Sequence, residues 1–398
     1  WCLANHARGA AVARWYTLVL STMALTYISA GAVMTDTFLV FGTTLSLVSM
    51  WFVLSGRSDY WRWWFFVGLA IGLLSKGPLA VVLTVTPLVL WAAIFRQQLQ
   101  PLKKLPWLLG SLLTLAIAVP WYVLAELKTP GFLNYFIIGE HFSRFLDPGW
   151  AGDLYGSAHD RPKGMIWIFW IWASFPWGII GLVGFGLAAA RGKTKDIFTG
   201  AVQDASTLYL LFCAITPMLF FTLAGNTLWT YILPSLPFSA ILIAGWVSQL
   251  NLRPWSRIRS GAVLLAPVLF TLSVFIGVSG VKPLKTEKQL IGRYESIQQA
   301  GDGPIFYIGK MPFSARFYSL GDAVEITSTE FDSLLDADGY ARVFAAIPND
   351  AVDKVLGPRA TDAQKLGENK RYQLFSIDLP PTDSQNDPVD SELNSKND

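Results

Sequence analysis

Apolar stretches long enough to cross a membrane recur along the first two-thirds of the chain. A helix needs about 17–25 such residues to cross a hydrocarbon core of ~30 Å, and the sequence predicts about nine spans. The chain is 53% hydrophobic and only 15% charged, whereas soluble domains carry about a quarter charged residues. We therefore expect a polytopic α-helical membrane protein. The predicted spans lie near residues 14–33, 37–55, 61–75, 78–95, 105–125, 164–190, 205–223, 228–249 and 260–281.

The basic residues of the short loops predict the orientation of these spans. Lys and Arg in short loops stay on the cytoplasmic side. Threading about nine spans alternately places most basic loop residues on one side: Arg8, Arg14, Arg57, Arg62, Arg96, Lys103, Lys104, Arg191, Lys193, Lys195, Arg253, Arg257 and Arg259. Fewer fall on the other side: Lys76, Lys128, Arg144, Arg161 and Lys163. The long 126–162 loop and the C-terminal region are thus expected in the periplasm, beyond a bacterial inner membrane.

The chain changes character after the last predicted span. Short β-rich runs alternate with amphipathic stretches over residues 283–379, which predicts a small periplasmic α/β domain. Residues 1–282 form the predicted membrane domain, and the polar 380–398 tail is expected to be disordered. The first residue is Trp1 and no signal-peptide pattern precedes it, so an N-terminally truncated chain is expected.

Composition argues against several other classes. A formal net charge of +3 without a basic stripe gives no reason to expect a nucleic acid partner. Two cysteines, Cys2 and Cys213, do not suggest a disulfide framework. Three histidines without close ligand spacing assign no metal site. We expect no certain cofactor, and a divalent metal stays open.

Two charged residues lie between spans with almost no loop around them. Ionisable groups at membrane depth are costly and indicate function by default. Asp36 can instead act as a helix N-cap. Lys76 can simply snorkel to the interface, or it can form an anion site with the helix that starts near Pro78.

The long loop contains a second group of candidates. Glu140 and Arg144 are four residues apart, so a helix places them on one face, where they can form a surface ion pair. The guanidinium of Arg144 can alternatively bind a phosphate through a bidentate fork. His141 and His159 are further candidates for the site loop.

The last turn precedes Tyr231, which is either an interface-belt aromatic or a hydroxyl donor to a lipid phosphate. Asp36, Lys76, Arg144 and Tyr231 all fall on the predicted periplasmic side. Two cations and a hydroxyl donor suit a phosphate held at the lipid–water boundary.

Several short motifs, in this order and spacing, resemble the glycosyltransferases that use polyprenyl-phosphate sugars. This group includes the protein O-mannosyltransferases and the 4-amino-4-deoxy-L-arabinose lipid A transferases, and the resemblance covers about residues 10–250. The matching stretches are Met34-Thr35-Asp36, Ser75-Lys76-Gly77-Pro78, Pro120-Trp121-Tyr122, Gly139-Glu140-His141-Phe142-Ser143-Arg144-Phe145, His159, Phe175-Pro176-Trp177 and Thr230-Tyr231-Ile232-Leu233-Pro234.

The resemblance implies a GT-C fold and an inverting transfer from an undecaprenyl-phosphate sugar to a lipid A-like lipid, glycan or protein acceptor. Lys76, Arg144 and Tyr231 match positions that hold the donor phosphate, and Asp36 matches an acidic position beside the site. The family's catalytic acid lies in a first periplasmic loop, which is expected upstream of this chain.

Two other functions compete with this interpretation. A lipid or solute transporter or flippase also carries charges within its membrane domain, but it favours midplane sites and repeated halves. An assembly subunit with a partner-binding periplasmic domain predicts that Lys76 and Arg144 tolerate substitution.

Overall fold

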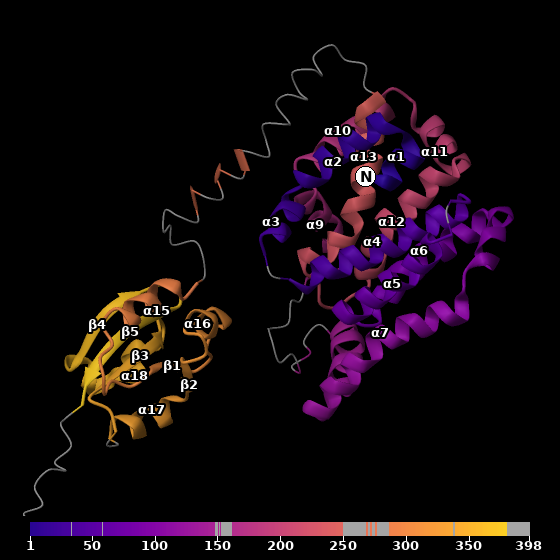
Figure 1. The fold of residues 1–398 in the computed structure, drawn as a ribbon. Helices are drawn as coiled ribbons and strands as arrows, with labels where there is room; N and C mark the ends of the chain where they lie inside the picture. Colours follow the sequence, from indigo (N-terminus) through magenta and orange to yellow (C-terminus); the bar gives the residue numbers. More distant parts are fainter. Residues whose placement is uncertain are drawn as a thin grey trace, which may run out of the picture. The chain divides into compact units, whose positions relative to one another are not determined.

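The computed structural model describes residues 1–32, 34–57, 59–147, 150, 152, 161–249, 286–336 and 339–379, with a few helical residues between 268 and 276. The chain divides into two compact units, Trp1–Phe270 and Thr271–Asp398 (Figure 1). Most residues around this division lie outside the described set, so the domain boundary expected near residue 283 stays a prediction. The last predicted span, 260–281, and the 380–398 tail likewise lie outside the described residues, in whole or in large part.

The first unit is helical. Its elements are α1 (Cys2–Arg8), α2 (Ala10–Ser21), α3 (Ala24–Ala30), α4 (Thr35–Leu54), α5 (Trp61–Lys76), α6 (Leu79–Ile94), η1 (Arg96–Lys104), α7 (Trp107–Lys128), η2 (Asn134–Ser143), α8 (Arg144–Leu146), α9 (Met165–Ala173), α10 (Trp177–Ala190), α11 (Thr194–Gln203), α12 (Ala205–Thr222), η3 (Trp229–Ser235) and α13 (Leu236–Gln249).

Four helical segments of the described chain are long and apolar enough to cross a membrane: Thr35–Leu54, Trp107–Lys128, Ala205–Thr222 and Trp229–Ser248. The helices α5 and α6 are shorter, at 16 residues each. Two predicted spans are broken. The 164–190 stretch forms α9 and α10, which bend by 109° around the Ser174–Pro176 connection, and the 14–33 stretch divides into α2 and α3.

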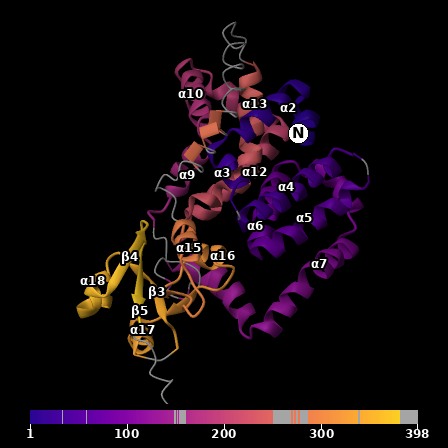
Figure 2. The same ribbon diagram turned by 60° about the vertical axis from the view of Figure 1, so that its left-hand side comes forward.

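The helices α4 and α5 cross at small residues. A Cβ atom built on Gly42 would lie 2.7 Å from the Gly68 carbonyl oxygen and 2.7 Å from the Gly72 nitrogen. The Ser46 hydroxyl donates to the Phe65 carbonyl at 2.9 Å across the same contact. Small residues let membrane helices approach backbone to backbone, so α5 is held closely against α4 (Figure 2).

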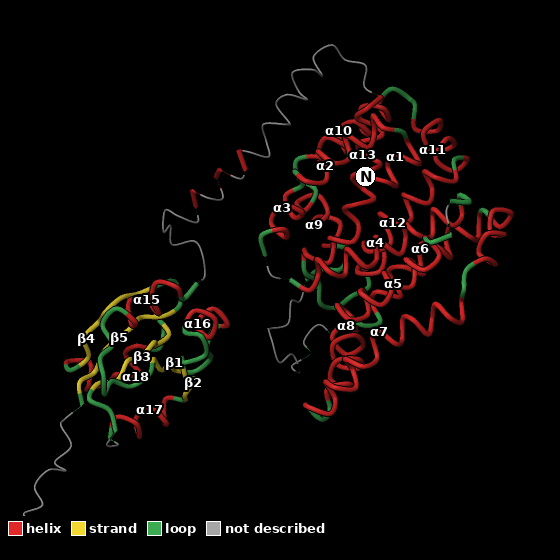
Figure 3. Tube along the Cα trace, in the orientation of Figure 1, coloured by secondary structure: helices red, strands yellow, loops and turns green. Residues whose placement is uncertain are grey.

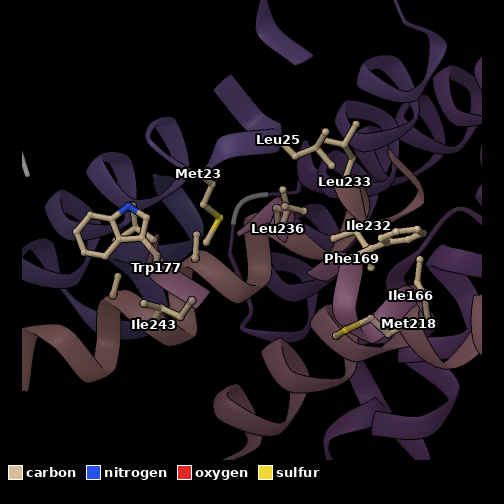
Figure 4. Close-up of a cluster of buried hydrophobic side chains, with 14 of the residues drawn as sticks. Met23, Leu25, Ile166, Phe169, Trp177, Met218, Ile232, Leu233, Leu236 and Ile243 are labelled. Carbon is tan, nitrogen blue, oxygen red and sulfur yellow. The ribbon is translucent and has the colours of Figure 1, made fainter. Parts of the chain in front are cut away.

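A buried apolar cluster joins segments that are far apart in the chain. Met23, Leu25, Ile166, Phe169 and Ile232 are among its members, which come from the ends of α2 and α3, from α9 and from η3 (Figure 4). The Trp177 indole N–H donates to the Thr22 hydroxyl at 2.7 Å, so the polar edge of this large side chain is satisfied inside the cluster.

The second unit is a three-layer α/β/α domain (Figure 3). Its strands are β1 (Ile305–Ile308), β2 (Val324–Ile326), β3 (Arg342–Pro348), β4 (Ala363–Glu368) and β5 (Tyr372–Asp378), in the order β2-β1-β3-β5-β4. Strand β1 pairs in parallel with β2 and β3, whereas β5 pairs antiparallel with β3 and β4. Helices α15 (Lys288–Glu295) and α16 (Phe313–Tyr318) cover one face; α17 (Ser328–Leu335) and α18 (Val352–Leu356) cover the other.

The predicted fold class is confirmed in its essentials, a helical membrane part followed by a small α/β part. Strands β1, β3 and β5 coincide with the β-rich runs of the sequence at residues 305–309, 342–347 and 372–377. Strands β2 and β4 were not predicted from the sequence. Strand β2 has only three residues, and β4 is a largely exposed edge strand with little apolar alternation.

Candidate functional site

Lys76 is the last residue of α5, and its side chain lies close to residues of two other elements of the helical unit. Its Nζ atom is 3.6 Å from the Asp36 carboxylate in the first turn of α4. The same ammonium lies 5.8 Å from the centre of the Tyr231 ring, which belongs to η3. The structure therefore brings three of the predicted site residues together. Met34 is the N-cap residue of α4 and Asp36 lies inside the first turn, so the interpretation of Asp36 as the N-cap is wrong.

His141 ties the long loop to the end of α5. Its Nε2 lies 2.7 Å from the Lys76 carbonyl oxygen, and its Nδ1 lies 2.6 Å from the Phe136 carbonyl oxygen. A neutral imidazole carries one N–H and donates to one of these two carbonyls, whereas the imidazolium would donate to both. The imidazole thus fixes the backbone that carries Lys76, which gives this predicted loop residue a positioning role.

Gly77 makes this contact possible. Its backbone has a φ of 54° and a ψ of −143°, a conformation that is essentially reserved for glycine. A Cβ atom there would lie 2.8 Å from Phe136 Cε1 and 3.0 Å from His141 Cε1. The chain therefore needs glycine here both for the turn and for the close approach of the loop, and α6 then begins directly after Pro78.

Glu140 and Arg144 form the ion pair that their spacing suggests, at 2.8 Å. Their side chains are 19% and 17% exposed, so the pair is shielded more than a surface pair. The Tyr135 hydroxyl also donates to Glu140, at 2.5 Å. These residues lie on η2, a π-helix, and on α8. Wide helical turns of this kind are frequent at functional sites.

The turn before Tyr231 contributes a residue that sequence reasoning missed. The Asn226 side-chain amide donates to the Arg144 and Asp147 carbonyls, both at 2.8 Å. The Gly225 amide donates to the Phe145 carbonyl at 2.7 Å. This turn therefore holds the Arg144 backbone. A single Asn in a short turn gives no sequence signal for such a role.

Tyr122 supports the same region from α7. Its hydroxyl donates to the Leu73 carbonyl at 2.6 Å, in the last turn of α5. Its ring also lies 5.9 Å from that of Phe136 on η2. The Pro120-Trp121-Tyr122 motif thus contributes a contact that braces the end of α5 and the loop that covers it.

An apolar cavity of about 250 Å³ lies next to these residues in the chain. Its lining includes Thr37, which follows Asp36, and Leu233, which lies two residues after Tyr231. The remaining lining residues are Leu20, Thr26, Ser29, Ala30, Val40, Leu236 and Pro237. A mostly apolar cavity of this kind suits the apolar part of a ligand.

The remaining predictions concern His159 and metals. His159 lies outside the described residues, so its position is not assigned. Within the part of the chain that the structure describes, no three His, Cys, Asp or Glu side chains gather into a metal-binding group.

Comparison with known proteins supports the predicted resemblance. Residues 1–136 match the family model of dolichyl-phosphate-mannose-protein mannosyltransferases. An undecaprenyl phosphate-α-4-amino-4-deoxy-L-arabinose arabinosyl transferase of Pseudomonas fluorescens is 30% identical over 225 residues, which is 55% of this chain and 35% of that protein. A second P. fluorescens transferase is 30% identical over 267 residues, covering 64% and 44%. The chain thus spans less than half the length of these curated relatives.

The crystal structure of ArnT from Cupriavidus metallidurans bound to undecaprenyl phosphate superposes with a TM-score of 0.70 at 16% identity. The superposition covers 94% of this chain and 80% of that one. The chain is therefore similar to these glycosyltransferases over part of its length, and it shares the GT-C fold of the ArnT structure. It is a multi-pass membrane protein with an ArnT-like arrangement of helices and a small C-terminal sheet domain.

Proposed function

We propose that this chain acts in a glycosyltransferase that moves a sugar from an undecaprenyl-phosphate donor to a lipid A-like lipid. A glycan or protein acceptor fits the same chemistry. The observation that carries the proposal is the convergence of Lys76, Asp36 and Tyr231, with His141 fixing the Lys76 backbone. The curated relatives are named as arabinosyl transferases, which points to the same reaction class.

The chemistry follows from where charge develops. The acceptor oxygen attacks the anomeric carbon of the sugar, and the bond from that carbon to the lipid phosphate oxygen breaks. The proton of an acceptor hydroxyl passes to an acidic side chain that acts as general base. Negative charge then grows on the departing phosphate. Preorganised cations that face such charge often contribute more to catalysis than any other feature of a site. Lys76 supplies one cation, and Arg144, whose backbone is held by Asn226, supplies a second.

Asp36 orients this machinery. Its carboxylate is 13% exposed and lies 3.6 Å from the Lys76 ammonium, so it fixes the cation in one direction. An acidic side chain in this position also suits the orientation of an acceptor hydroxyl. The apolar cavity beside Thr37 and Leu233 offers room for part of the isoprenoid chain of the donor.

The proposed location is the bacterial inner membrane, with the site and the sheet domain on the periplasmic face. The support is the gathering of basic loop residues on the opposite side. A cysteine placed at exposed Ser333 on α17 tests this orientation. A membrane-impermeant maleimide added to spheroplasts should label it without lysis; labelling that requires lysis would reverse the topology.

The activity is tested with the full-length protein in detergent, a radiolabelled undecaprenyl-phosphate sugar and a lipid A acceptor. The variants Lys76→Ala and Arg144→Ala should each lower kcat/KM by about 10²–10³-fold if they face the leaving phosphate. Lys128→Ala, an exposed lysine at the end of α7, is the matched control and should keep normal turnover. Near-normal transfer by both site variants would remove them from the phosphate site. Absence of transfer together with lipid translocation in liposomes would favour a flippase.

A further inference from the structure

Helix α16 of the sheet domain carries large apolar side chains that its own domain does not bury. Phe313, Phe317 and Leu320 are 67%, 72% and 92% exposed. Phe313 and Phe317 are four positions apart on α16 and therefore lie on the same side of the helix. Leu320 follows in the turn after the helix. These three residues are here named the α16 ridge. Soluble domains usually keep such side chains scattered, and a contiguous group marks an interaction surface.

The inner side of α16 is well anchored, so the ridge has a fixed outward orientation. Ala315 is fully buried against the sheet, and Tyr318 packs against the same core. The Ser319 hydroxyl accepts a hydrogen bond from the Ala323 amide at 3.0 Å, which fixes the turn after the helix. The exposure of the ridge is therefore a consequence of the fold of the domain itself.

Leu320 is an unusual residue for its place. Its φ is 54°, in the left-handed region, where glycine or asparagine is the ordinary choice and a branched apolar residue costs about 1–2 kcal/mol. The helix end is closed by the Gly321 amide, which donates to the Arg316 carbonyl at 2.9 Å. A small residue such as glycine would suit both the left-handed backbone and the exposure of this position. The presence of leucine therefore points to another surface that contacts its side chain.

The charges around the ridge favour an anionic surface. Lys288 and Arg293 are exposed on α15, which packs beside α16, and Arg316 is exposed on α16 itself. Glu295 is the only carboxylate on these two helices. Lys310 is also exposed before α16, and Asp322 and Glu325 are exposed after it, so exposed cations exceed exposed carboxylates by four to three. Apolar side chains flanked by cations are the pattern of segments that lie in the headgroup layer of anionic membranes.

Chain continuity places such a surface within reach. The helical unit contains the membrane-crossing segments and ends its described helices at Gln249, and α15 of the sheet domain begins at Lys288. The domain is therefore joined to a membrane-embedded unit through residues 250–287. We propose that the α16 ridge inserts into the headgroup layer of the same membrane and that anionic phospholipids are its partner.

Nitroxide labels on the full chain in proteoliposomes of phosphatidylethanolamine and phosphatidylglycerol test the proposal. In a Cys2→Ser background, with Cys213 buried, labels are placed by Phe317→Cys, Leu320→Cys and, as control, Ser333→Cys on α17. Collision rates with oxygen and with a water-soluble nickel chelate are then compared. For labels in the headgroup layer, the ratio of the collision rate with oxygen to that with the nickel chelate should be at least about threefold higher than for the control label.

Two results would overturn the proposal. Equal nickel access at the ridge and at Ser333 would place the ridge in water. Low access for both reagents would mean that protein covers it, either the helical unit or another subunit. In a second experiment, the Phe313→Ser/Phe317→Ser variant should lose the oxygen preference at a label on position 320, while circular dichroism stays unchanged. Retention of that preference would exclude the ridge as the anchor.

Discussion

Substituting Gly77 with alanine tests whether the contact between the long loop and the end of α5 sustains the site. The new methyl group would lie 2.8 Å from Phe136 Cε1 and 3.0 Å from His141 Cε1. The His141 ring cannot easily move away, because both of its nitrogens contact backbone carbonyls. Either the loop or the Lys76 backbone has to shift, so the ammonium loses its position.

The magnitude follows from comparison with a matched glycine. Gly131 has a φ of 90°, and a Cβ atom on it would have nothing within 4 Å. Both alanine variants carry a backbone cost of about 1–3 kcal/mol, but only Gly77→Ala adds overpacking of about 1–3 kcal/mol. The difference corresponds to roughly 5- to 150-fold in turnover if it falls on the transition state.

The assay measures sugar transfer and thermal unfolding of both variants, the latter by tryptophan fluorescence in detergent. Gly77→Ala is expected to lose turnover, or to unfold at a lower temperature, relative to Gly131→Ala. Equal turnover and equal Tm in the two variants would refute the role assigned to the close approach between this turn and His141.

Three further predictions concern packing and charge. Gly68→Ala should lower the stability of the helical unit by about 1–3 kcal/mol in detergent melts, whereas Gly186→Ala, with nothing within 4 Å, should not. Asn226→Ala should lower kcat clearly while it changes Tm little, because the Asn226 amide holds two backbone carbonyls of the loop that carries Arg144. Burial alone would raise the pKa of Asp302, but hydrogen bonds from Arg342 and a backbone amide, with the Arg342 charge, outweigh it and lower this pKa. The pair therefore stabilises the sheet domain at pH values above the ordinary carboxyl pKa, and this stability is lost as pH falls through the lowered pKa of Asp302. In chemical denaturation, Asp302→Asn should lower the free energy of unfolding by ~2 kcal/mol at neutral pH. The variant should also show a weaker dependence of that free energy on pH.

Much of the helical architecture could be predicted because hydropathy and loop charge act locally. The spans at α4, α7 and α12 lie within a few residues of their predicted bounds. The break between α9 and α10 was missed, although Pro176 in the predicted 164–190 span was a signal for it. The hydropathy of a continuous apolar run does not show whether the helix axis changes direction within it.

The site was predictable as a set of residue types on one side of the membrane, but its connections were not. Asp36, Lys76 and Tyr231 were predicted individually, and only the fold shows that they meet. Asn226 acts through carbonyls about eighty positions earlier in the chain, and no local pattern encodes such a partner. The Glu140–Arg144 pair was predictable because helical spacing alone brings the two together.

The glycine contact between α4 and α5 divides the proposed site into two parts of different character. Asp36 and Lys76 are carried by helices whose backbones touch, so their separation is set by main-chain geometry and leaves little room for drift in evolution. Arg144 and Glu140 are carried by a loop that side chains such as Asn226 hold in place. A substitution in the loop can therefore move Arg144 without changing the separation of Asp36 and Lys76, whereas a larger residue at the helix crossing would change that separation.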